Sequence, residues 1–71
     1  MTNKQALEIL RARGYATGTP DARSGRIRVW THQSGFAVDV AMGQELEDLA
    51  AGRLSLEEIS DRREDEVLAE T

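Results

Sequence analysis

Two runs of alternating side chains in the middle of the chain constrain its fold more than any other feature. Apolar residues occupy every second position over residues 26–32 and again over residues 36–42. A period of two is typical of strands that have one buried and one exposed face. Ser34 and Gly35 separate the two runs and suit a tight turn, so the sequence predicts an antiparallel β-hairpin over residues 26–42.

The turn also predicts a register for this hairpin. A two-residue turn at Ser34 and Gly35 would place Trp30 opposite Asp39, and the apolar positions of both strands would share one face. A slip by one residue would set apolar side chains against polar ones. The other face would then consist of Arg26, Arg28, Trp30, His32, Ala37, Asp39 and Ala41.

The segment before the hairpin is predicted to form a helix and a loop. Thr2 and Gln5 have the spacing of a capping box, in which each side chain bonds the other residue's backbone N–H, and this predicts a helix over residues 3–13. Gly14 suits the end of that helix. Residues 14–25 include glycines and the single proline but little that could be buried, which predicts a loop.

Two further helices are predicted after the hairpin. Glycines bracket a helix over residues 44–51, and its first acids, Glu45 among them, would complement the positive end of the helix dipole. Ser55 and Glu58 form a second capping box, which predicts a helix over residues 56–69 with a frayed C-terminal end. The apolar stripe of this last helix comprises Leu56, Ile59 and Val67.

Together these elements predict an α+β protein with one domain over residues 1–71 and the order α-β-β-α-α. The helices are expected to pack on one face of the hairpin, because a lone hairpin is only marginally stable without a covering layer. A homodimer is also predicted, since self-association would extend the sheet or bury Trp30. The predicted core comprises Leu7, Leu10, Ile27, Val29, Val38, Val40, Leu46, Leu49, Leu56 and Ile59.

Composition excludes several classes of protein. The chain has 71 residues, no cysteine and one histidine, so it has no disulfides and no thiolate metal site, and we predict neither metal nor cofactor. No apolar run reaches the roughly 18 residues of a membrane helix, and the first residues lack the apolar stretch of a signal peptide. These features predict a cytoplasmic protein that does not act at a membrane.

His32 is the only histidine in the chain and therefore the first residue to consider as a general base. Ser34 follows it closely and Asp39 would lie diagonally across the hairpin, so a Ser-His-Asp set can be drawn. Such a set requires buried, preorganised side chains in a cleft, whereas these would lie on an exposed ribbon. The sequence therefore predicts a protein without enzymatic activity, and a small enzyme would require turnover that depends on His32.

The two halves of the chain differ in charge. Residues 1–35 have six Lys or Arg and two acids, while residues 36–71 have three Arg and eleven acids, giving +4 and −8 within a net charge of −4. Because Trp and Arg often anchor interfaces, the first half supplies one predicted partner-binding surface. Its residues, with one from the second strand, are Arg26, Arg28, Trp30, His32 and Asp39. The second predicted surface is an acidic helix face made of Glu57, Glu58, Asp61, Glu64 and Asp65.

These surfaces predict a small protein-binding module, a regulator or inhibitor, that uses the Arg/Trp face, the acidic helix or both. An acid-rich helix can occupy a basic surface that normally holds nucleic acid. The alternative is a nucleic-acid-binding accessory protein that uses the basic first half, in which case its affinity would fall steeply with salt.

Overall fold

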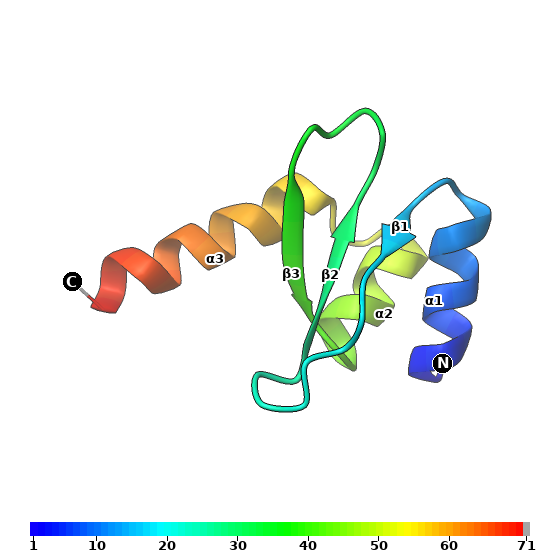
Figure 1. The fold of residues 1–71 in the computed structure, drawn as a ribbon, viewed down its shortest axis with the longest axis horizontal. Coiled ribbons are helices and arrows are strands. Elements are labelled where there is room, and N and C mark those ends of the chain that lie inside the picture. The colour runs from blue at the N-terminus through cyan, green and yellow to red at the C-terminus, as the bar shows by residue number, and fades with distance from the viewer. Residues whose placement is uncertain (71) are drawn as a thin grey trace.

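The computed structural model describes residues 1–70, and of Glu70 only the backbone. Thr71, which the predicted domain includes, lies outside the described residues. The described chain forms one compact α+β domain (Figure 1), which confirms the predicted class. Its order is α-β-β-β-α-α, with one strand more than predicted. The elements are α1 (Asn3–Ala12), β1 (Ala16–Thr17), β2 (Arg26–Trp30), β3 (Ala37–Ala41), α2 (Gln44–Ala51) and α3 (Leu56–Glu70).

The additional strand, β1, lies in the segment that was predicted to be a loop. It pairs antiparallel with β2, and Ala16 lies opposite Trp30. Just after β1, the Gly18 N–H donates to the Arg28 carbonyl at 2.8 Å. The prediction of a loop over residues 14–25 is wrong at β1, because the backbone groups of β2 need partners on both of its edges. A strand of two residues is also too short to show a period in the sequence.

The hairpin of β2 and β3 has a different register from the predicted one. Trp30 lies opposite Ala37, and not opposite Asp39. The predicted two-residue turn is wrong because Thr31 and Ser34 form a turn of their own. The Thr31 N–H donates to Ser34 Oγ at 3.1 Å, and the Ser34 N–H donates to Thr31 Oγ1 at 2.9 Å. The shift is two residues, so each strand residue keeps its face of the sheet.

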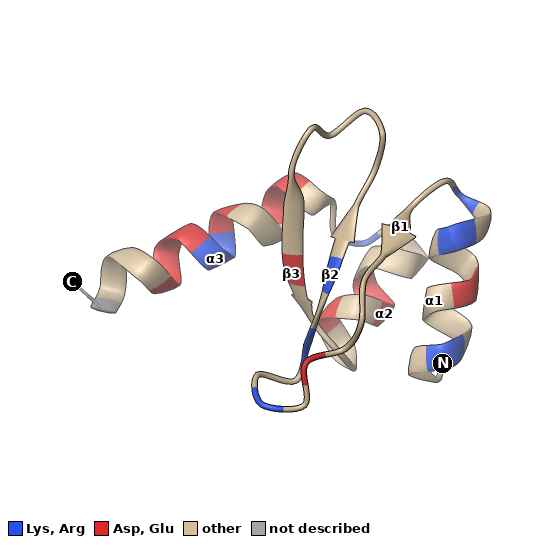
Figure 2. Ribbon diagram, viewed as in Figure 1, with Lys and Arg blue, Asp and Glu red and all other residues tan. Residues whose placement is uncertain are grey.

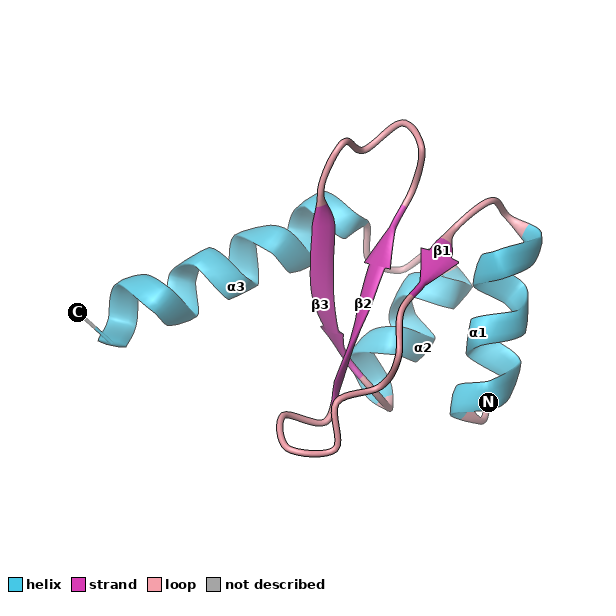
Figure 3. Ribbon diagram, viewed as in Figure 1, coloured by secondary structure: helices cyan, strands magenta, loops and turns pink. Residues whose placement is uncertain are grey.

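Helices α1 and α2 cover one face of the three-stranded sheet, and the strands pass in front of α2 in Figure 3. Apolar side chains from both helices, β2, β3 and the start of α3 meet there. The buried apolar residues are Ala6, Leu10, Ile27, Val29, Val38, Val40, Leu46, Leu49, Ala50, Leu56 and Ile59. This set contains the predicted core except Leu7, which is only partly buried. Phe36 is 42% exposed, because it lies in the longer connection between the strands.

Helix α3 starts in the core and then crosses the outer edge of β3. Leu56 and Ile59 are buried. One turn later, Arg63 Nη1 donates to the Asp39 carbonyl at 3.4 Å. The helix then continues beyond the sheet (Figure 1), and Val67 is 62% exposed. The predicted apolar stripe is therefore wrong at Val67, because the sheet ends before the helix does.

Candidate functional site

The outer face of the sheet, opposite α1 and α2, holds most of the predicted Arg/Trp surface. Trp30 is half-buried and lies over the neighbouring strand segment, where a Cβ built on Gly18 would stand 3.8 Å from its ring. Ala37, its cross-strand neighbour, is exposed. Figure 1 shows no helix of the described residues over this face of the strands. Trp30 is therefore neither a core residue nor a fully exposed one.

Both arginines of the outer face have carboxylate partners within the chain. Arg26 Nη2 donates to the Glu66 carboxylate on α3, at 3.0 Å from each oxygen. Arg28 lies directly opposite Asp39, and its Nε is 3.5 Å from Asp39 Oδ1. These two pairs cancel much of the positive charge that the sequence predicts for the face, so a phosphate group would have to compete with carboxylates.

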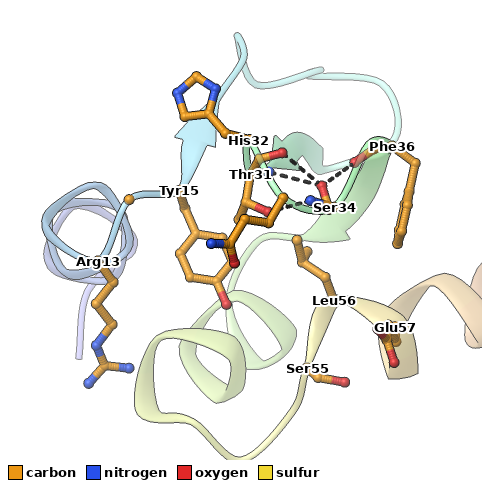
Figure 4. Close-up of a pocket in the computed structure, with 11 residues that line it drawn as sticks. Arg13, Tyr15, Thr31, His32, Ser34, Phe36, Ser55, Leu56 and Glu57 are labelled. Atoms are coloured by element: carbon orange, nitrogen blue, oxygen red, sulfur yellow. Dashed lines mark hydrogen bonds between the residues drawn. The ribbon is translucent and has the colours of Figure 1, made fainter.

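The structure separates His32 from the rest of the predicted surface. Its side chain is exposed in the connection between β2 and β3, and its ring points away from the neighbouring side chains (Figure 4). Ser34 Oγ lies 3.0 Å from the Thr31 carbonyl and 2.9 Å from the Phe36 carbonyl. Asp39 has its arginine partner instead. These three residue types therefore do not assemble into a Ser-His-Asp set.

An open hollow of about 700 Å³ lies beside the same connection (Figure 4). Tyr15, from the turn after α1, and Leu56, from the start of α3, form part of its wall. Two polar groups at its rim are already engaged: Arg13 Nη1 donates to the Ala50 carbonyl at 2.8 Å, and Ser55 Oγ accepts a backbone N–H of α3. Ligand sites require a few convergent polar groups, so we assign no site to this hollow.

The predicted acidic face lies on α3, which shows several acidic positions along its length in Figure 2. Positions 57, 61, 64 and 65 recur at helical spacing and share one side of the helix. Their side chains, Glu57, Asp61, Glu64 and Asp65, are exposed and have no cation within ion-pair distance among residues 1–70. Glu58 differs, because it accepts the Ser55 N–H at 3.3 Å and completes the predicted capping box. We name the four carboxylates without a cation partner, Glu57, Asp61, Glu64 and Asp65, the acidic strip.

A buried carboxylate, for which the sequence predicted only an interaction with the helix dipole, attaches α3 to the sheet. Glu45 is 8% exposed, and its Oε1 accepts the Ala41 N–H at 2.9 Å. Its Oε2 accepts from Arg63 Nη2 at 2.9 Å and lies 3.4 Å from Arg62 Nη1. Glu45 lies in the first turn of α2, as predicted, and these contacts add to its predicted interaction with the helix dipole. A signal was present, because Glu45 stands one helical turn before the buried Leu49.

A second carboxylate closes the connection between α2 and α3. Asp48 Oδ1 accepts from Arg53 Nε at 2.8 Å and from Gln44 Nε2 at 2.9 Å. The hydrogen bond from Arg53 first, and that from Gln44 second, lower the pKa of Asp48 below its ordinary value. Asp48 is therefore held as a carboxylate by its neighbours.

Comparisons with other proteins add no relative. No known protein family, curated protein or solved structure matches this chain. Within residues 1–70, no group of three or more acids or histidines could hold a metal ion. None of the described helices is long and apolar enough to cross a membrane. The fold and its surfaces define a class only: a small α+β protein with a three-stranded antiparallel sheet and a projecting acidic helix.

Proposed function

We propose that the protein is a non-enzymatic protein-binding module, a small regulator or inhibitor, and that α3 is its main binding element. One observation carries this proposal. The part of α3 that extends beyond the sheet presents unpaired carboxylates beside an apolar side chain, Val67, that is 62% exposed. A helix with adjoining apolar and charged sides is a common ligand for grooves on other proteins.

The chemistry of α3 indicates the kind of partner. Because the acidic strip has no cation among the described residues, a partner's Lys or Arg would not need to displace an existing ion pair. Val67 adds apolar area that such a contact could bury. The partner that fits is a protein with a basic groove and an apolar floor, such as a surface that otherwise holds nucleic acid.

The Arg/Trp face is proposed as the second contact surface of the module. Trp30 offers area for an interface, but Arg26 would have to leave Glu66 to bind an anion, and Arg28 is partly neutralised by Asp39. For that reason nucleic-acid binding through the basic half stays the alternative proposal. We also propose that the protein acts in the cytoplasm, because a chain without cysteine suits a reducing compartment, and that it forms a homodimer.

The test is capture of partners from the lysate of the native cells on the tagged chain, with and without nuclease, followed by affinity measurement on the captured protein. The variant neutralises the acidic strip by Glu57→Gln, Asp61→Asn, Glu64→Gln and Asp65→Asn. Exposed ion pairs contribute about 0.2–1 kcal/mol each, so the loss of four should lower its affinity roughly 4-fold or more, and the wild-type affinity should fall with salt.

Glu8→Gln is the control, because it neutralises an exposed acid on α1 instead. It should bind the partner like the wild type. Equal binding by the neutralised α3 variant would contradict the role of α3. A signal lost on nuclease treatment would favour the nucleic-acid alternative.

A further inference from the structure

We propose that the outer face of the sheet binds a second copy of this chain in a two-fold symmetric dimer, with the two sheets face to face. The face comprises Arg28, Trp30, Ala37, Asp39 and Ala41. This inference rests on the proposed binding-module function and names the surface and the partner of its self-association. It is independent of the acidic strip.

The first argument is the shape of the face. Trp30 is large and half-buried, while its cross-strand neighbour Ala37 is small and exposed. Phe36, 42% exposed, continues the apolar area toward the end of the hairpin. A shallow hollow of about 380 Å³ lies between Trp30, Phe36 and Ala37. Packed sheets interdigitate their side chains, so the tryptophan of one copy can fill the space beside the alanine of the other.

The second argument is the charge of the face. Arg28 and Asp39 stand directly opposite each other across the strands, and their side chains are 65% and 51% exposed. At 3.5 Å, the pair leaves both groups open to further partners. A two-fold interface requires a surface that complements itself, because the same patch of both copies is in contact. If one residue contacts a second residue of the other copy, the reverse contact also forms. A neighbouring cation and anion satisfy this condition, because Arg28 of each copy can bond Asp39 of the other.

The same charges argue against other occupants. Asp39 would repel an acidic partner. A nucleic acid would have to displace Glu66 from Arg26 before its phosphates could bind that side chain. The face is also small, since its strands have only two, five and five residues, whereas a standard stable interface buries roughly 800 Å² per partner. The dimer should therefore be weak, and its population should rise with concentration.

The experiment is sedimentation velocity of the purified chain over a 100-fold range of concentration, with charge reversals of the central pair. Arg28→Asp alone gives a face with two acids, and Asp39→Arg alone gives a face with two cations. Each variant alone should be monomeric where the wild type dimerises. An equimolar mixture of the two should form a heterodimer, and the chain with both reversals should dimerise like the wild type.

Two controls guard against effects on folding. Far-UV circular dichroism should show that each reversed variant is folded, and Ala37→Glu, at an exposed position, should abolish dimerisation without changing that spectrum. Trp30, the only tryptophan, should become less accessible to iodide quenching as the concentration of wild type rises.

A monomer at every concentration would overturn the proposal, and so would folded single reversals or a folded Ala37→Glu variant that dimerise like the wild type. Partner capture through α3 separates this outcome from the first proposal. If the chain stays monomeric but still captures a partner through α3, only the dimer proposal is overturned. If the chain dimerises but captures no partner through α3, only the proposed role of α3 is overturned.

Discussion

Replacing Glu45 by Gln tests how strongly α3 is attached to the sheet. The new side chain has nearly the same shape and can still accept the Ala41 N–H. Its amide group, however, would place N–H donors against Arg63, which also has only donors. The substitution therefore leaves a partly buried guanidinium without its closest anion, at the point where the helix crosses β3.

The size of the effect follows from the burial of the partners. Breaking a fully buried ion pair costs about 3–5 kcal/mol. Here Arg63 is 19% exposed and keeps Glu66 at 3.4 Å, so the cost should be lower. We expect a loss of about 1.5–3 kcal/mol in the free energy of unfolding, the range for hydrogen bonds to charged groups. At about 4–8 °C per kcal/mol, the melting temperature should fall by roughly 6–24 °C.

The assay is urea unfolding followed by the fluorescence of Trp30 and by far-UV ellipticity. Arg62→Gln is the matched control, because it removes only the exposed cation at 3.4 Å from Glu45 and should cost less than about 1 kcal/mol. A loss below about 0.5 kcal/mol for Glu45→Gln, or one equal to that of Arg62→Gln, would refute the attachment of α3 through this carboxylate.

Three further predictions concern stability, each measured by urea unfolding. Ile59→Ala should cost about 2–5 kcal/mol because it opens a cavity in the core, whereas Val67→Ala should stay within about 0.5 kcal/mol because Val67 is mostly exposed; similar losses would contradict the boundary of the core along α3. Ser34→Ala should cost about 1 kcal/mol, since its hydroxyl accepts the Thr31 N–H, and an unchanged midpoint would contradict that turn. The pKa of Asp48 is lower in the folded chain than in the unfolded chain, so its carboxylate stabilises the fold at pH values above the unfolded pKa. This contribution is lost as the pH falls through the folded pKa, so stability should drop below about pH 4. Asp48→Asn should flatten that drop, and an equally steep drop would assign it to other groups.

The sequence predicts the core well because apolar periodicity and local caps agree. Two alternating runs, two capping boxes and the glycines between elements each depend on neighbours within a few residues. The Thr2 box forms as predicted, with the Gln5 N–H donating to Thr2 Oγ1 at 3.1 Å. Such local signals predict which face of each helix or strand is buried, and so they also predict which side chains of the sheet face the core.

Register and long-range pairs could not be predicted in the same way. The alternation has a period of two, so registers that differ by two residues bury the same side chains. The hydrogen bonds between Thr31 and Ser34 determine which of these registers forms, because they compete with a two-residue turn at Ser34 and Gly35. The partners of Arg26 and Glu45 lie on α3, 40 and 18 residues further along the chain, beyond the reach of any local sequence rule. For the candidate surfaces, the sequence therefore predicts where the charged residues lie but not which of them form ion pairs with distant residues, as Arg26 does with Glu66.

The crossing of α3 over β3 has a consequence for the chain during its synthesis. An outer strand with free backbone groups is a template for pairing with other chains. The Ala41 N–H has its acceptor, Glu45, only four residues later, but the donor to the Asp39 carbonyl, Arg63, lies on α3, which is synthesised after β3 and α2. Nascent chains that end before α3 therefore present an open sheet edge, and chains truncated before Arg63 should aggregate more readily than the whole chain.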